Sequence, residues 1–210
     1  MKTKDRLIYA LLALSAIGLM PLAQWLVLAR YGSSIFFVFT MFYLFWSLAA
    51  VLALPVLLVR VCFKRYRTRA LPWLLLALFY LPCYVVGSYL EDQVWVSEWE
   101  AFTERSLPLI QAIKQFEQDQ GTPPKELVEL VPDYLPAVPD TGIRACPNYR
   151  YESGDIAFKQ YAGNSWVLWF PTPVFGVGFD EMLYFPKQNY PKRGNGGSLE
   201  RVADWAYVHE

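Results

Sequence analysis

The sequence predicts a membrane protein with three transmembrane α-helices followed by an exported α+β domain, in which a long helix packs on an antiparallel β meander. Two observations predict this fold class. Residues 1–90 contain long apolar runs without charged side chains, and residues 91–210 pass from helical apolar spacing to short aromatic runs. We therefore divide the chain into a transmembrane region, 1–90, and a domain, 91–210.

Three apolar runs, Leu7–Ala29, Ile35–Val59 and Leu71–Leu90, each have 20 residues or more and contain no Asp, Glu, Lys, Arg or His. A helix of about 20 apolar residues crosses the roughly 30 Å hydrocarbon core of a bilayer. A charged residue at mid-membrane costs about 2.5–3.5 kcal/mol, so the absence of charge is informative. The runs predict spans over about 7–29, 35–59 and 71–90, with the lipid bilayer as the first partner of the chain.

Basic residues in the loops predict the direction of insertion. Residues 2–6 carry a net charge of +2, and the segment 60–69 between the second and third runs carries +5. Lys and Arg collect in cytoplasmic loops, so we expect the N-terminus and the 60–69 segment in the cytoplasm. Three crossings then place the domain on the opposite side. The predicted location is the bacterial inner (plasma) membrane, with the C-terminal domain in the periplasm.

The first run also has features of a cleaved signal peptide. Lys2–Arg6 is typical of a basic n-region and Leu7–Leu14 of an h-region, with small residues at Ser15 and Ala16. The apolar run continues to Ala29, which is longer than an h-region and favours a retained span. Cleavage stays open at this point, and the domain lies on the same side of the membrane in either case.

The net charge of zero divides into two parts of opposite sign, because residues 1–90 carry +8 and residues 91–210 carry −8. An acidic exported domain disfavours nucleic acid and anionic lipid headgroups as its partners. The cysteines are Cys62, Cys83 and Cys146, and only Cys146 falls in the domain. We therefore expect no disulfide within the domain, which must be held together by its hydrophobic core.

After residue 90 an apolar stripe predicts that the third helix continues into the domain to about residue 120. Its members recur at spacings of three and four residues: Trp99, Phe102, Leu109, Ile110, Ile113 and Phe116. Gly121 follows at the position of a left-handed helix C-cap. Pro108 inside the run predicts a kink, or a restart of the helix with Ser106 as its N-cap.

Beyond Gly121 the pattern predicts a short second helix and then a sheet. Thr122 is a suitable N-cap with proline in the first turn, and the helix over 127–131 would end at Pro132. Aromatic and β-branched runs separated by turn residues predict strands over 149–152, 156–161, 166–170, 182–185 and 205–208. We expect an antiparallel meander with the long helix across one face.

A series of spaced residues joins the end of the long helix to the first predicted strand. Its members are Ala112, Ile113, Phe116, Asp119, Gly121, Pro124, Leu127, Leu130, Pro132, Tyr134, Leu135, Pro139, Asp140, Tyr149 and Tyr151. In order and spacing they resemble the soluble domains of type II secretion pseudopilins and of their type IV pilin relatives. The resemblance implies a membrane helix that runs on into a periplasmic α+β domain. This chain differs from pilin-like proteins in having two further spans before that helix.

Aromatic residues gather in the second half of the domain and give the one candidate interaction face. We select Trp166, Trp169, Phe175 and Phe179, which lie in or after the predicted strand 166–170. Half of the aromatic side chains of a meander point inward and build the core. The outward half is expected to form an exposed apolar face for a protein partner, a sugar or a lipid.

No residue pattern indicates a catalytic, cofactor or metal site. Asp180 and Glu181 are an acidic pair without the further spaced oxygens that a calcium site needs. Pro191–Ser198 contains basic residues and glycines but lacks the Gly-x-x-x-x-Gly-Lys order of a phosphate-binding loop. His209 is expected to pair at the last strand, and one histidine does not make a zinc site. The prediction is a protein that is not an enzyme and holds no cofactor.

Two functions from different classes fit these observations. The first is a structural or protein-interaction role in the cell envelope, with the domain displayed on its membrane anchor to another envelope protein. The second is a ligand-binding sensor or accessory domain that accepts a small molecule on the exposed aromatic face. A closed and lined pocket in the domain would favour the second.

Overall fold

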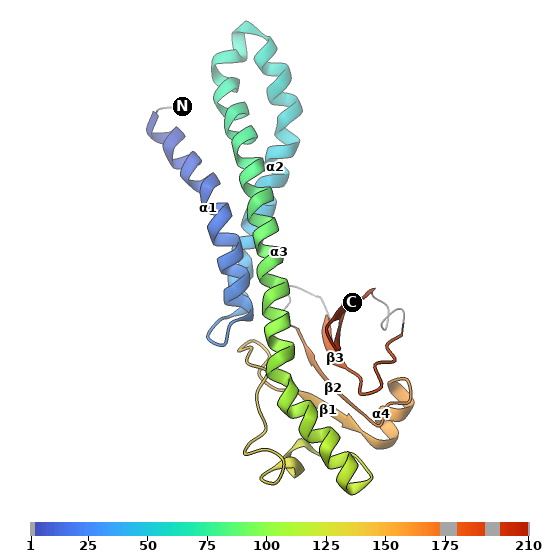
Figure 1. The fold of residues 1–210 in the computed structure, drawn as a ribbon. Helices are drawn as coiled ribbons and strands as arrows, with labels where there is room; N and C mark the ends of the chain where they lie inside the picture. Colours follow the sequence, from blue (N-terminus) through green and yellow to red (C-terminus); the bar gives the residue numbers. More distant parts are fainter. Residues whose placement is uncertain (1–2, 173–179, 192–197, 210) are drawn as a thin grey trace. The chain divides into compact units, whose positions relative to one another are not determined.

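The computed structural model of the chain describes residues 3–172, 180–191 and 198–209 (Figure 1). The chain forms two compact units. The helical unit comprises Met1–Val27 and Ile35–Val96, and the sheet unit comprises Leu28–Ser34 and Ser97–Glu210. Phe175 and Phe179 of the predicted face lie outside the described residues.

The helical unit is built from α1 (Thr3–Leu28), α2 (Phe37–Cys62) and the first part of α3 (Lys64–Gln120). A single 3₁₀ turn, η1 (Ser34–Phe36), precedes α2. Among the described residues these three helices are long and apolar enough to cross a membrane, in agreement with the three predicted runs. Only Phe63 separates α2 from α3, so most of the basic segment 60–69 is helical rather than a loop.

The three helices of this unit pack through a small buried cluster, Ala13, Ala16, Met20, Tyr43 and Tyr80. The Tyr80 hydroxyl donates a hydrogen bond to the Tyr43 carbonyl oxygen at 2.8 Å, which joins α3 to α2. The hydroxyls of Ser15 and Tyr43 lie 2.6 Å apart and join α1 to α2. Small residues and interhelical hydrogen bonds are the usual means of helix packing where the surroundings are apolar.

Gly87 of α3 lies against α1 at a position where no other residue fits. A Cβ atom at Gly87 would stand 2.5 Å from the carbonyl oxygen of Ala16 and 3.2 Å from the sulfur of Met20. Backbone atoms of a neighbouring helix do not yield to such a contact. Gly87 therefore permits the close approach of α3 to α1.

The second part of α3 enters the sheet unit and ends where the sequence predicts. Gly121 has φ +74°, and its N–H donates to the Glu117 carbonyl oxygen at 2.9 Å, which is the expected left-handed C-cap. The helix is continuous past Pro108, so the predicted restart at Ser106 is wrong. Ser106 instead bonds back to the Thr103 carbonyl oxygen at 2.7 Å within the helix.

The predicted second helix is a single 3₁₀ turn, η2 (Leu127–Leu130), which begins after Glu126. Thr122 is not its N-cap, because extended backbone at Glu126 separates the two prolines from the turn. The fully buried Leu130 fixes the turn to the core. Four residues are too few for a stable α-helix, so burial of one side chain decides this local structure.

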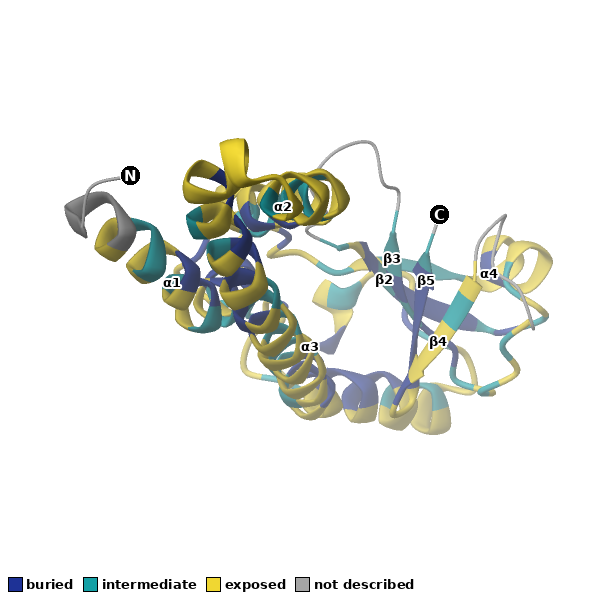
Figure 2. Cartoon of the chain, turned by 90° about the horizontal axis from the view of Figure 1, so that it is seen from above, coloured by how far each residue is buried: buried dark blue, intermediate teal, exposed yellow. Residues whose placement is uncertain are grey.

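The sheet has five antiparallel strands in the order β1-β2-β3-β5-β4. The strands are β1 (Arg150–Ser153), β2 (Trp166–Pro171), β3 (Glu181–Tyr184), β4 (Ser198–Val202) and β5 (Trp205–His209). The strands β1, β2 and β3 form a meander, but its members differ from the predicted ones, because the run 156–161 is not a strand and β3 takes the third place. The predicted strand at 205–208 is β5, and it pairs with β3 because β4, which was not predicted, forms the edge (Figure 2).

One predicted strand is a helix. Residues 156–161 belong largely to α4 (Gly154–Gln160), which follows β1 directly. Asp155 in the first turn and Lys159 in the last turn match the helix dipole, and Gly154 with φ +67° turns the chain into the helix. Ala157 is fully buried whereas Ile156 and Phe158 are more than half exposed. The apolar and aromatic residues that suggested a strand therefore form no buried sheet face.

One face of the sheet and α3 enclose the core of the sheet unit. The largest side chains buried between them are Trp99, Phe102, Leu109, Ile113, Trp166, Leu168, Phe170, Tyr184 and Trp205. Hydrogen bonds cross from the sheet to the helix. The Trp205 indole N–H donates to Ser106 Oγ at 3.0 Å, and the Trp166 indole N–H donates to Glu117 Oε2 at 2.9 Å. The predicted α+β arrangement, a long helix on an antiparallel sheet, is confirmed.

Candidate interaction cleft

The face of the sheet opposite α3 carries the alternate residues of each strand. Trp169 in β2 pairs with Arg150 in β1 and with Leu183 in β3. Val208 in β5 continues this face, since it pairs with Leu199 of β4. Side chains alternate between the two faces of a strand, so these residues point away from the helix-covered core. This outer face is apolar along its middle.

The segment that follows β3 borders this outer face and is held by its own ring contacts. Phe185 and Tyr190 stack with ring centroids 4.7 Å apart, and Tyr161 meets Phe185 edge to face at 6.0 Å. The Tyr190 hydroxyl accepts the Phe185 N–H at 2.9 Å and donates to the Asp204 carbonyl oxygen at 2.6 Å. Burial raises the pKa of Tyr190, so the hydroxyl keeps its proton at neutral pH.

Asn164 ties the turn after α4 to the same segment. It is fully buried, and its Nδ2 donates to the Tyr161 carbonyl oxygen and to Asn189 Oδ1, both at 2.7 Å. Its Oδ1 accepts the Lys187 backbone N–H at 3.1 Å. A buried amide whose donors and acceptor are engaged fixes the two chain segments relative to each other.

These elements surround a cleft of about 420 Å³ on the outer face. Its walls include Tyr161, Trp169, Glu181, Leu183, Tyr190 and Leu199, from the turn after α4, from β2, β3 and β4, and from the segment after β3. Ligand sites in proteins typically enclose about 300–1,000 Å³ and combine apolar walls with a few polar groups. The cleft meets both criteria.

Trp169 is the residue of the predicted face that lines this cleft. The Arg150 guanidinium lies over its ring, with Cζ 4.5 Å from the ring centroid. The Trp169 indole N–H has no contact with solvent and no hydrogen-bond partner in the described part of the chain. A buried donor without a partner costs about 1–3 kcal/mol.

The structure corrects the other members of the predicted face. Trp166 is fully buried against α3 and bonded to Glu117, so its inclusion in an exposed face is wrong. Phe175 and Phe179 lie outside the described residues. Trp166 and Trp169 differ by three positions, an odd number, and odd spacing in a strand places side chains on opposite faces. The spacing within the run could have separated them.

Sequence reasoning missed most of the residues that complete the cleft. Tyr161 was assigned to a predicted strand but directly follows α4, and Tyr190 was not among the residues selected for the face. The sheet face of Arg150 could have been predicted, because Arg150 alternates with Tyr149 and Tyr151 of the core. That alternation places Arg150 on the outer face, where Trp169 is its direct cross-strand neighbour.

A polar cluster at the C-terminal end of β5 surrounds His209, the one histidine of the sequence. His209 Nδ1 is 3.5 Å from Asp180 Oδ2, and His209 Nε2 is 3.5 Å from Glu200 Oε2. The Tyr207 hydroxyl donates to Asp180 Oδ2 at 3.0 Å. Within the described residues no group of three or more His, Cys, Asp and Glu side chains is arranged to hold a metal ion.

Cys146 is the cysteine of the sheet unit, and it is buried. Burial raises the pKa of its thiol to about 12. A thiol with so high a pKa stays protonated at neutral pH and is a poor nucleophile. Cys146 therefore acts as a small packed side chain.

Comparisons of the chain with protein-family models, with curated proteins and with solved structures find no match. The groups that line the cleft include aromatic rings and the carboxylate of Glu181. Such groups bind a ligand or a partner by stacking and hydrogen bonding.

Proposed function

We propose that this chain is an inner-membrane protein whose three helices anchor a periplasmic domain with a structural or protein-interaction role. The observation that carries the anchoring is the continuity of α3, which begins in an apolar span and supplies the central helix of the sheet unit. The basic flanks at 2–6 and 60–69 support a cytoplasmic N-terminus.

The assignment of chain segments to the two units supports this topology. Leu28–Ser34, the link between α1 and α2, belongs to the same compact unit as the domain. Three successive crossings would place the link Leu28–Ser34 and the domain on one side of a bilayer and the 60–69 segment on the other. The pseudopilin-like relation stays a prediction.

A fusion experiment tests the topology. Alkaline phosphatase placed after Glu210 is expected to be active, because the enzyme folds only outside the cytoplasm, and inactive when inserted in the 60–69 segment. Green fluorescent protein at the same positions is expected to give the reverse pattern. Active phosphatase in the 60–69 segment together with fluorescence after Glu210 would contradict the proposed orientation.

The interaction role is assigned to the cleft that contains Trp169. The observation that carries this role is the cleft of about 420 Å³ itself, which is lined by Trp169 and other apolar and aromatic side chains. In-cell crosslinking of the full chain should yield an adduct with another envelope protein that is lost in Trp169→Ala. Phe158→Ala is the matched control, since Phe158 is 60% exposed on α4. Equal crosslinking by both variants would remove the cleft from the proposal.

The volume of the cleft favours a second function, a sensor that binds a small molecule at the same residues. In that case a small polar aromatic or sugar ligand raises the melting temperature of the purified chain without any protein partner. Trp169→Ala abolishes this shift and Phe158→Ala keeps it. A shift of equal size in both variants would place the ligand elsewhere.

A further inference from the structure

The hairpin of α2 and α3 combines a tight turn with a concentration of positive charge. Phe63 joins the helices, and its carbonyl oxygen accepts the N–H groups of Tyr66 and Arg67 at 3.0 Å. The segment 60–69 carries five basic residues and no acidic one. All five basic side chains are exposed.

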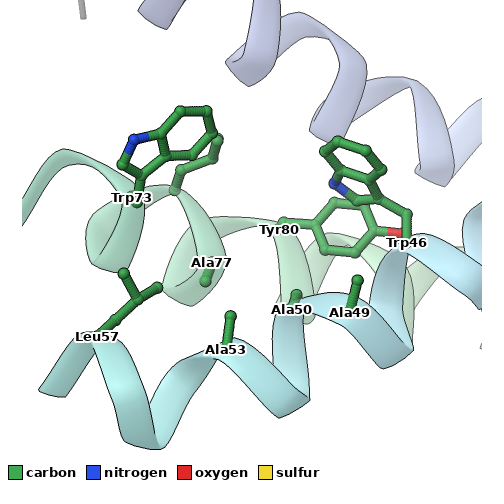
Figure 3. Close-up of a pocket in the computed structure, with 9 residues that line it drawn as sticks. Trp46, Ala49, Ala50, Ala53, Leu57, Trp73, Ala77 and Tyr80 are labelled. Carbon is green, nitrogen blue, oxygen red and sulfur yellow. The ribbon is translucent and has the colours of Figure 1, made fainter. Parts of the chain in front are cut away.

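A pocket of about 270 Å³ lies between α2 and α3 beside this turn (Figure 3). Alanines of α2 at positions 49, 50 and 53 form one wall, together with Leu57. Figure 3 shows Trp73 and Leu57 at one end of the pocket and Trp46 at the other. The lining side chains carry no charge, so the pocket fits hydrocarbon rather than a polar ligand.

The ring of Tyr80 closes one side of this pocket and is fixed in place. Its hydroxyl donates to the Tyr43 carbonyl oxygen at 2.8 Å, so its polar group is already engaged. The alanine side chains are small and leave this space open, whereas larger side chains at these positions would fill it. The hollow therefore follows from small residues on α2 and aromatic residues that cannot collapse into it.

Two arginines continue the faces that line the pocket. Arg60 follows Leu57 by three residues, and Arg69 precedes Trp73 by four. Residues at these spacings lie on the same face of a helix, about one turn or 5 Å apart along its axis. Arg60 and Arg69 therefore stand on the pocket side of the hairpin, one turn nearer to the connection at Phe63.

We propose that the α2–α3 hairpin binds one anionic phospholipid, with a hydrocarbon chain in the pocket and the phosphate at Arg60 and Arg69. Charge complementarity selects this occupant: a membrane lipid is the ligand that places a negative group one helical turn beyond an apolar chain. The inference rests on the proposed membrane insertion and adds a ligand to it. A second transmembrane helix fits less well, because Trp46 and Trp73 bound the pocket at both ends.

The test uses the full chain reconstituted in nanodiscs of phosphatidylcholine and phosphatidylglycerol, followed by native mass spectrometry of the lipid that remains bound after mild detergent. We expect one phosphatidylglycerol per chain, enriched over phosphatidylcholine. Arg60→Gln with Arg69→Gln should lower the enrichment about tenfold or more, because each basic contact contributes roughly fivefold.

The matched control removes the same charge from other faces of α3. Lys64 and Arg67 lie roughly 180° and 120° around the helix from Trp73, at 100° per residue. Lys64→Gln with Arg67→Gln is expected to lower the enrichment by less than about threefold. Equal losses in both double variants would show diffuse attraction to the membrane surface and overturn the proposed site.

A substitution that fills the pocket tests the hydrocarbon part. Ala53→Leu should reduce the bound lipid of either headgroup, whereas Val51→Leu on the exposed side of α2 should not. The proposal would be overturned if Ala53→Leu left lipid binding unchanged. It would also be overturned if the wild-type chain formed a dimer without bound lipid and Ala53→Leu dissociated that dimer.

Carbonate extraction separates this inference from the proposed function. If alkaline carbonate removes the chain from membranes, that result refutes both the membrane anchor and the lipid site. A chain that stays in the membrane but retains phosphatidylglycerol and phosphatidylcholine equally refutes the lipid site alone.

Discussion

Replacement of Phe102 by alanine should destabilise the sheet unit strongly, because this side chain joins α3 to the sheet. Phe102 is fully buried, and its ring lies 5.0 Å from the rings of both Phe170 and Trp205. Removing a buried phenylalanine ring from a core typically costs about 3–5 kcal/mol in the free energy of unfolding. We expect a loss in this range, since edge-to-face ring pairs add about 0.5–1.5 kcal/mol each to simple burial.

The measurement is urea unfolding of the full chain in detergent micelles, followed by near-ultraviolet circular dichroism of the aromatic core. Leu107→Ala on the same helix is the control, because Leu107 is 43% exposed. The control should cost less than about 1 kcal/mol, as expected for a partly exposed side chain. A Phe102→Ala loss as small as that of the control would mean that α3 does not cover the core, and the reasoning from the apolar stripe would fail.

Three further perturbations test other parts of the structure. Ser106→Ala leaves the buried Trp205 indole N–H without its acceptor at 3.0 Å. The free energy of unfolding in urea should fall by about 1–3 kcal/mol. A change near zero would show that this hydrogen bond is not formed. Gly87→Ala places a methyl group 2.5 Å from the Ala16 carbonyl oxygen. This overpacking should cost about 1–3 kcal/mol in the free energy of unfolding and lower the melting temperature of the helical unit. An unchanged melting temperature would exclude the close packing of α3 on α1. Burial raises the pKa of Cys146 to about 12, above its value of about 8.5 in the unfolded chain, so its contribution to stability is complete below about pH 8.5 and is lost as the pH rises toward 12. Unfolding of the wild type and of Cys146→Ser over this alkaline range should give a smaller pH dependence for the variant, and equal slopes would show that the thiol does not contribute.

Strand positions followed from runs of aromatic and branched residues bounded by turn residues. The runs at 166–170, 182–185 and 205–208 are strands of the sheet, and most of their side chains are buried. The run at 156–161 has similar residues but is α4, since only Ala157 within it is deeply buried. The exposed edge strand β4 carries too few apolar residues to give any period-two signal.

The candidate site was predicted less well than the fold. Trp169 lines the cleft, whereas Trp166 belongs to the core. Both residues have the same type and occur in one strand, so composition does not separate them. The separation depends on which face α3 covers, and this is decided by contacts between residues far apart in the chain, such as Trp166 with Glu117.

The amino-acid sequence by itself determined the three long apolar helices, the end of α3 at Gly121, and the α+β class of residues 91–210. These features depend on local properties, namely hydropathy over one segment, glycine at a positive φ and the period of apolar residues. Only the tertiary structure decided the strand order, the cleft at Trp169 and the pocket between α2 and α3. Each of these arises where side chains from separate segments meet, and the free energy of that packing is not encoded in any single segment.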